Sequence, residues 1–187
     1  QEVLSFVKSG AHSAQSTADM LQPDPSMVYA VVDRRRFAHA DPNDSLYGMQ
    51  WHLHSVEQSA IAANLAWDAT EGNASFIVAV LDTGVRADHP DLTGKLLPGY
   101  DFIADLPVAN DGDGRDADAS DPGDWIDSSD RLNSFFRDCD VHDSSWHGTR
   151  VAGLIGAATN NGAGIAGAAW RTAILPCLLY TSPSPRD

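Results

Sequence analysis

The sequence has few cysteines, few basic residues and no long apolar run, and each shortage narrows what the protein can be. Cys139 and Cys177 are the two cysteines among 187 residues, and they permit at most one disulfide between them. Twelve Lys and Arg stand against 26 Asp and Glu, and the net charge of −14 argues against a nucleic acid or an anionic membrane as partner. No apolar run approaches the ~20 residues that cross a bilayer, and no signal peptide is visible.

The acidic residues are concentrated in one segment. Residues 101–130 contain ten Asp, no Glu, no Lys and a single Arg, Arg115. This segment belongs to an expected loop over residues 101–143, and loops of that length are uncommon unless they are functional or ordered by something else. The remaining composition, 43% hydrophobic and 20% charged, is that of a globular domain with a core.

The stretch IVAVLDTGVRADHPDL, residues 77–92, places an acid directly after an apolar strand. Nearly every position of the strand expected at 76–81 is apolar, which predicts a strand covered on both faces, as in a parallel sheet. Three roles are open for Asp82 at the end of this strand. It can cap a turn, serve as one acid of an aspartic protease, or orient a catalytic histidine.

The stretch SSWHGTRVAGLIGAATNN predicts a helix that His147 opens and that Ser144 or Ser145 caps. Three glycines in this helix indicate that its backbone packs very close to another segment. TAILPCLL then predicts a second buried strand. Strand, helix and strand in this order indicate a doubly wound parallel sheet, whose sites form at the carboxyl ends of the strands. Asp82 and His147 can therefore meet there.

Two further elements are expected upstream. Residues 27–32, MVYAVV, predict a strand. Residues 55–72 predict a helix with Ser55 as N-cap, Gln58 at the capping-box position, Ile61 and Leu65 on one face, and Gly72 as terminator.

The blocks VAVLDTGVRADHPDL and SSWHGTRVAGLIGA, with Asp82 and His147 65 residues apart, resemble the Asp and His blocks of the subtilisin family (subtilases) over about residues 41–176. The resemblance implies an α/β, subtilisin-like, doubly wound parallel sheet with flanking helices, incomplete in this chain. It implies a secreted serine endopeptidase, with Asp82 as the orienting acid and His147 as the general base. It disfavours an aspartic protease, since no second Asp-Thr/Ser-Gly block is present.

The family's serine lies in a GTSMA block that this sequence does not contain, and Ser144, Ser145 and Ser182 lack that context. The chain alone is therefore expected to be inactive, and a calcium-binding pseudoprotease or binding module is the alternative. The resemblance assigns residues 1–40 to an inhibitory propeptide and implies that Cys139 pairs with a cysteine beyond this sequence. Residues 177–187 are expected to be a non-native or disordered tail. We further expect the protein to act on protein or peptide substrates and to be a monomer.

Calcium is the cofactor that the resemblance implies. Its site would combine Asp44, Asp91 and Asn161 with the carbonyl oxygens of Thr159, Ala163 and Ile165. A second calcium could bind in NDGDGRDADASD, where acids alternate with small residues, although the stretch lacks the Glu of an EF-hand. Its candidate ligands are Asp111, Asp113, Asp116 and Asp118, and a solvated acidic loop is the equal alternative.

Overall fold

The computed structural model describes residues 13–30, 32, 41–54 and 56–179. The chain divides into two compact units, Gln1–Ala38 and His39–Asp187. This division falls close to the expected boundary at residue 40. No helix among the described residues has both the length and the apolar character that a membrane span requires.

The first unit contains the helix α1, Ala14–Leu21, whose N-cap Ser13 accepts a hydrogen bond from the Ser16 amide at 3.0 Å. The strand expected at 27–32 is wrong for residues 27–30, which are irregular, and residue 31 lies outside the described residues. A strand needs a hydrogen-bonding neighbour. The described part of this unit contains no other strand, and the amide of Ala30 instead bonds to the Gln22 side chain at 3.0 Å.

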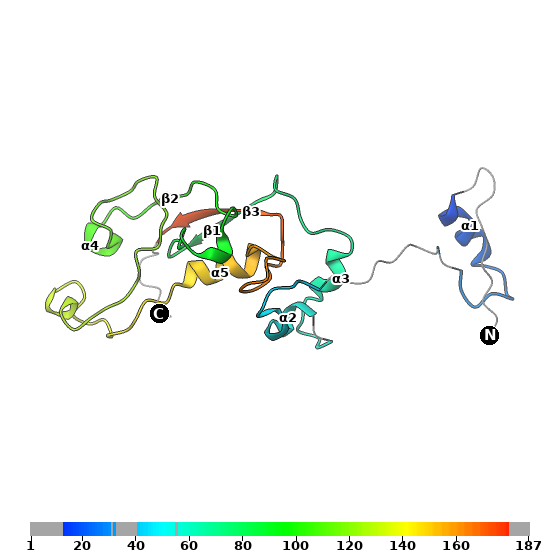
Figure 1. Cartoon of the computed structure of the whole chain (residues 1–187), viewed down its shortest axis with the longest axis horizontal. Coiled ribbons are helices and arrows are strands. Elements are labelled where there is room, and N and C mark those ends of the chain that lie inside the picture. Colours follow the sequence, from blue (N-terminus) through cyan, green and yellow to red (C-terminus); the bar gives the residue numbers. More distant parts are fainter. Residues whose placement is uncertain (1–12, 31, 33–40, 55, 180–187) are drawn as a thin grey trace. The chain divides into compact units, whose positions relative to one another are not determined.

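The second unit is built on a parallel sheet with the order β1-β3-β2 (Figure 1). Its strands are β1, Ile77–Asp82, β2, Tyr100–Asp101, and β3, Ala173–Leu178. The helix α5, His147–Gly156, packs against β1 and β3. The α/β architecture with a parallel sheet is thus confirmed, and the register that pairs Asp82 with Leu178 aligns the carboxyl ends of β1 and β3.

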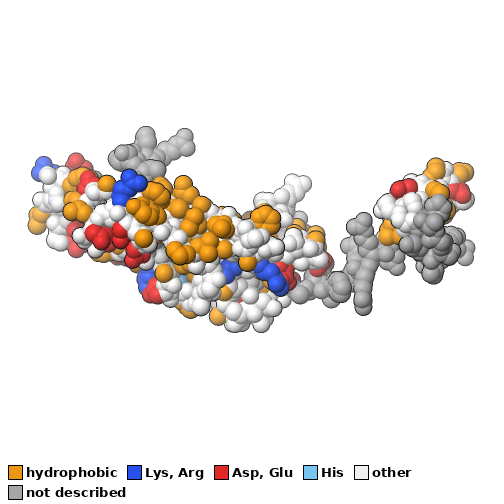
Figure 2. All heavy atoms as spheres, turned by 90° about the horizontal axis from the view of Figure 1, so that it is seen from above, with side chains coloured by type: hydrophobic (Ala, Val, Ile, Leu, Met, Phe, Trp, Pro, Cys, Tyr) orange, Lys and Arg blue, Asp and Glu red, His pale blue; other side chains and the backbone are white. Residues whose placement is uncertain are grey.

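The core of the sheet lies on the side that faces α5. It consists of Val80, Val85, Leu92, Ala152 and Ile174, all at most 4% exposed. The expectation that β1 is covered on both faces is wrong, because Ile77 is 56% and Leu81 61% exposed. No described element covers that face, and Figure 2 shows hydrophobic side chains gathered there.

The helix expected over 55–72 is also wrong. Only the short helix α3, Ala63–Trp67, lies within this range, whereas another short helix, α2, Trp51–His54, ends before it, and residue 55 is outside the described residues. Ile61 and Leu65, the expected apolar face, are 62% and 57% exposed. The buried residues here form a cluster that joins this segment to the chain after α5. Its members are Tyr47, Leu53, Ala63 and Ala166. Tertiary packing therefore overrides the local helical pattern.

The long loop is confirmed, with the short helices α4, Leu106–Ala109, and η3, Asp130–Leu132, inside it. Two other single-turn helices, η1, Tyr47–Met49, and η2, Pro90–Leu92, complete the elements. The expected tail at 177–187 overlaps β3, because Cys177 and Leu178 are paired in the sheet and Leu178 is fully buried. Residues 180–187 lie outside the described residues.

Candidate active site

Asp82 and His147 meet at the carboxyl end of β1. The Nδ1 atom of His147 lies 2.8 and 2.9 Å from the two carboxylate oxygens of Asp82. A carboxylate only accepts, so Nδ1–H is the donor, and a neutral imidazole in this arrangement carries its lone pair on Nε2. The Asp82 side chain is 14% exposed and that of His147 64% exposed. None of the described residues hydrogen bonds to Nε2, which leaves that nitrogen open to solvent or to a substrate.

Gly148 explains how the helix reaches the strand so closely. A Cβ added at this position would collide with the carbonyl oxygen of Gly84 and lie 3.1 Å from the Cβ of Asp82. Only a glycine lets the first turn of α5 approach the end of β1. The prediction that the glycine-bearing helix packs its backbone against another segment is confirmed at this residue.

Thr83 joins the strand end to the helix and to the acidic loop. Its hydroxyl donates to the Asp121 carboxylate at 2.9 Å and accepts from the Gly148 amide at 3.1 Å. Asp121 is 5% exposed. Burial raises the pKa of the Asp121 carboxyl, and the negative charges of Asp124 and Asp82 raise it further. Sequence analysis did not identify Asp121, whose only local signal is the Asp-Pro-Gly turn that it begins.

Asp124, also missed from the sequence, holds the segment that enters α5. Its carboxylate accepts hydrogen bonds from the Ser145 amide at 2.6 Å and from the Ser145 hydroxyl at 2.7 Å. That hydroxyl in turn accepts from the His147 amide at 3.2 Å. Ser145 therefore provides the predicted cap, although the N-cap position itself is Trp146, in a left-handed conformation with φ 51°.

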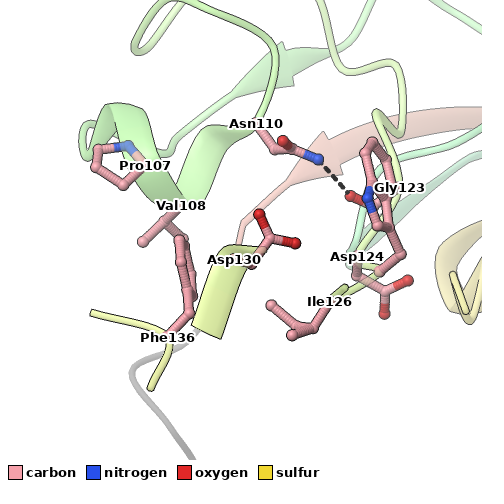
Figure 3. A pocket seen from close by; sticks show the side chains of 9 residues that line it. Pro107, Val108, Asn110, Gly123, Asp124, Ile126, Asp130 and Phe136 are labelled. Atoms are coloured by element: carbon pink, nitrogen blue, oxygen red, sulfur yellow. Dashed lines mark hydrogen bonds between the residues drawn. The ribbon is translucent and has the colours of Figure 1, made fainter. Parts of the chain in front are cut away.

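Asp124 also lines a pocket of about 190 Å³ next to this chain of hydrogen bonds. Its other walls come from α4 and from residues around η3, and the Asn110 amide group donates to the Gly123 carbonyl at 3.1 Å across one side (Figure 3). The lining mixes apolar side chains such as Val108 and Phe136 with carboxylates, and it contains no Ser, Thr, Cys, Lys or His side chain.

The residues expected to bind calcium are brought together by the structure. Asp44 and Asp91 are each 5% exposed. Asp91 accepts hydrogen bonds from the Asn161 side chain at 3.0 Å and from the Ile165 amide at 2.9 Å. Asp44 accepts from the Asn160 amide at 2.7 Å. Two buried carboxylates thus meet one loop, and neither forms an ion pair with a Lys, Arg or His of the described residues.

Thr159 and Ala163 lie in the same loop. The Thr159 hydroxyl accepts from the Gly167 amide at 2.9 Å, and the Ala163 amide donates to the Asn161 side-chain oxygen at 2.8 Å. Hard oxygens and the lack of a paired cation fit calcium. No three His, Cys, Asp or Glu side chains of the described residues are gathered as a metal site, so a calcium ion here would take its remaining ligands from amide and carbonyl oxygens.

The acidic stretch is mostly exposed. Asp111 and Asp113 lie at the surface, and Asp116 is half-buried. The Asp116 and Asp118 side chains accept hydrogen bonds from backbone amides two residues ahead. Cys139 and Cys177 are both free thiols in the structure.

Comparison with known proteins finds similarity to proteases. Residues 73–185 match the model of the Subtilase family. An extracellular basic protease of Dichelobacter nodosus is 40% identical over 87% of this chain and 26% of its own length. An extracellular protease of Xanthomonas campestris pv. campestris is 38% identical over 87% of this chain and 27% of its own.

A solved protease structure from Pseudoalteromonas arctica PAMC 21717 superposes with a TM-score of 0.64. It is 44% identical, and the match covers 74% of this chain and 38% of that one. The chain therefore spans about a quarter of the length of the curated relatives named above.

Proposed function

The chain belongs to the subtilase family, and on this premise we propose that it is the acid- and base-bearing part of a secreted serine endopeptidase. The observation that carries the proposal is the hydrogen-bonded pair of Asp82 and His147, with Nε2 left open. The names of the extracellular relatives from Dichelobacter and Xanthomonas support secretion and a protein substrate.

In this proposal His147 transfers the proton and Asp82 orients and stabilises His147. Nε2 of His147 takes the proton of a serine hydroxyl as the serine oxygen attacks the peptide carbonyl carbon. The Asp82 carboxylate holds the imidazole in the tautomer that keeps Nε2 unprotonated, and it stabilises the imidazolium that forms. His147 then returns the proton to the departing amine. Water hydrolyses the acyl-enzyme in the second half of the reaction.

We propose that the serine is supplied by a part of the complete protein outside these 187 residues, because no serine of this chain stands in the family's serine block. The 187-residue chain would then be inactive by itself. Loss of one member of such a triad costs up to ~10⁶ in turnover.

Labelling with a fluorophosphonate probe tests both statements, because the probe reacts only with an activated serine. The full-length product should be labelled, its Asp82→Asn and His147→Ala variants should be labelled far more slowly, and the 187-residue chain should remain unlabelled. A folded full-length protein that resists the probe would contradict the enzyme assignment and favour a pseudoprotease.

Calcium at Asp44, Asp91 and Asn161 is the second part of the proposal. Its support is the buried, cation-free pair of carboxylates at one loop. A bound calcium would compensate their charge and hold the loop at 159–165 against η2. Chelation by EDTA should lower the melting temperature of the chain, and the Asp91→Asn variant should be less sensitive to EDTA. Equal sensitivity of the two proteins would remove this site.

Residues 1–40 are proposed, from the resemblance alone, to be the end of an inhibitory propeptide. The corresponding peptide should inhibit the full-length mature enzyme, whereas a scrambled peptide of the same composition should not.

A further inference from the structure

The pocket that Asp124 lines is held in shape by hydrogen bonds within the protein. Its volume of about 190 Å³ is below the ~300–1,000 Å³ of pockets that take a drug-sized ligand, so its size suits one long side chain. The bond from the Asn110 amide group to the Gly123 carbonyl closes one side. On another side, Ile126 exchanges two backbone hydrogen bonds with His142, each 3.0 Å long. These bonds fix the walls without a ligand.

The lining of this pocket combines apolar surface with negative charge. Val108, Ile126 and Phe136 are half-buried and provide apolar walls. Asp124 and Asp130 bring two carboxylates, whereas no Lys, Arg or His lines the pocket. Such a lining fits a ligand with an apolar stem and a positively charged end, the two features that lysine and arginine side chains combine.

Asp130 is the carboxylate that can pair with a cation. Both oxygens of Asp124 are already bonded to Ser145. The Oδ2 atom of Asp130 accepts from the Asp127 amide at 2.8 Å, but none of the described residues donates to its Oδ1 atom. Figure 3 shows the Asp130 carboxylate pointing toward the Asn110 amide group. Two acceptors, the Asp130 Oδ1 atom and the Asn110 side-chain oxygen, therefore face the same part of the pocket.

The pocket lies beside the proposed catalytic histidine. Ser145 accepts from the His147 amide at 3.2 Å and donates to the Asp124 carboxylate at 2.7 Å, so two hydrogen bonds join the pocket wall to the His147 backbone. An extended peptide advances only ~3.3 Å per residue. A residue close to the bond that is cleaved can therefore place its side chain in this pocket. The ten Asp and one Arg of residues 101–130 would attract a positively charged peptide to it.

We propose that this pocket is a subsite for an arginine side chain of the substrate. The guanidinium would pair with Asp130, and the aliphatic stem would lie against Val108 and Phe136. Arginine fits better than lysine, because its planar group of five donors can reach the Asp130 and Asn110 oxygens together and can stack on an aromatic ring. The inference rests on the proposed endopeptidase function and names a substrate preference of that same site.

Binding of Nα-acetylarginine N-methylamide to the 187-residue chain tests the pocket without requiring activity. The NMR signals of the Asn110 side-chain amide report occupancy, and the citrulline analogue is a control of nearly the same shape without the charge. The arginine compound should bind at least ~5-fold more tightly than the citrulline compound, and Asp130→Asn should remove this difference. The matched control Asp138→Asn changes an exposed acid outside the lining and should keep it. Equal binding of the two compounds to the wild type would overturn the proposal.

Cleavage by the full-length protein tests whether the pocket serves the substrate. In peptides that carry arginine or citrulline at successive positions around the cleaved bond, arginine at one position should raise kcat/KM at least ~5-fold. Asp130→Asn should abolish that gain, whereas Asp138→Asn should not. An active protein whose arginine preference is the same in both variants would overturn the subsite.

The two experiments separate this inference from the function on which it rests. A full-length protein that binds the arginine compound but cleaves no peptide would contradict the proposed function while the pocket stands. The pair of compounds keeps the binding test decisive if circular dichroism shows that Asp130→Asn does not fold, because that comparison uses the wild-type chain alone.

Discussion

Gly148 is the position where a single methyl group should disturb the pairing of the two proposed catalytic residues. In a Gly148→Ala variant, the new Cβ would meet the carbonyl oxygen of Gly84 and the Cβ of Asp82. The obstacle at Gly84 is backbone, which cannot rotate away as a flexible side chain would. The start of α5, and His147 with it, must therefore move away from β1.

The size of the effect follows from two opposing terms. Overpacking of this kind costs about 1–3 kcal/mol, whereas replacing glycine by alanine within a helix gains up to about 1 kcal/mol. The net loss in free energy of unfolding should be roughly 1–2 kcal/mol. For a domain of this size, that loss lowers the melting temperature by roughly 2–8 °C.

Gly153 in the same helix is a matched control. A Cβ there would meet only the Ile165 Cδ1 atom, at 3.5 Å, an ordinary contact. Gly153→Ala should therefore stabilise the chain by up to about 1 kcal/mol. Urea denaturation of the three proteins measures both changes. If both variants shift stability in the same direction, the close approach at Gly148 is not what determines the effect.

The hydrogen bonds around the helix start lead to three further predictions. Thr83→Val removes the side-chain hydroxyl that is bonded to buried Asp121 and should lower the free energy of unfolding, measured by urea denaturation, by about 1–3 kcal/mol; an unchanged midpoint would refute this. Burial raises the Asp121 pKa above its ordinary value of 3.8, so its stabilising contribution is complete below pH 3.8 and is lost as the pH rises through the higher folded pKa. Stability measured against pH should accordingly fall less steeply over this window in Asp121→Asn than in the wild type, and parallel curves would contradict the linkage. Asp124→Ala removes both hydrogen bonds to Ser145 and should lower the free energy of unfolding, measured by thermal unfolding, by about 1–2 kcal/mol. Asp127 is exposed and bonds to a serine in the same pattern, so the control Asp127→Ala should lower it by less than about 0.5 kcal/mol.

Much of the candidate site could be predicted because its signals are local. An apolar run that ends in Asp82, and a helix that begins at His147, are properties of short segments. Their order along the chain indicates a parallel sheet, and a parallel sheet brings its carboxyl ends to one edge. The resemblance likewise predicted that the loop with Asn161 lies beside Asp91. In the structure the Asn161 Nδ2 atom is 3.0 Å from the Asp91 Oδ1 atom.

The errors came from segments whose structure depends on distant neighbours. The expected helix over 55–72 had a good local pattern, yet Ala63 and Trp67 pack with Tyr47 and Ala166 and determine where the chain turns. The strand expected at 27–32 had no partner strand among the described residues of its own unit. The coverage of β1 was misjudged because an all-apolar strand does not reveal which of its faces has a neighbour.

The sequence by itself determined which groups stand at the site: an acid at the end of a parallel strand, a histidine at the start of a helix, and a strongly acidic loop between them. Only the tertiary structure decided which acids of that loop are buried. Asp101, Asp121 and Asp124 look alike in the sequence, but folding buries one oxygen of Asp101 without a hydrogen-bond partner, bonds Asp121 to Thr83 and places Asp124 at the entry to α5. The reason is physical, because burial and hydrogen bonding depend on segments that are far apart in the chain and meet only after folding.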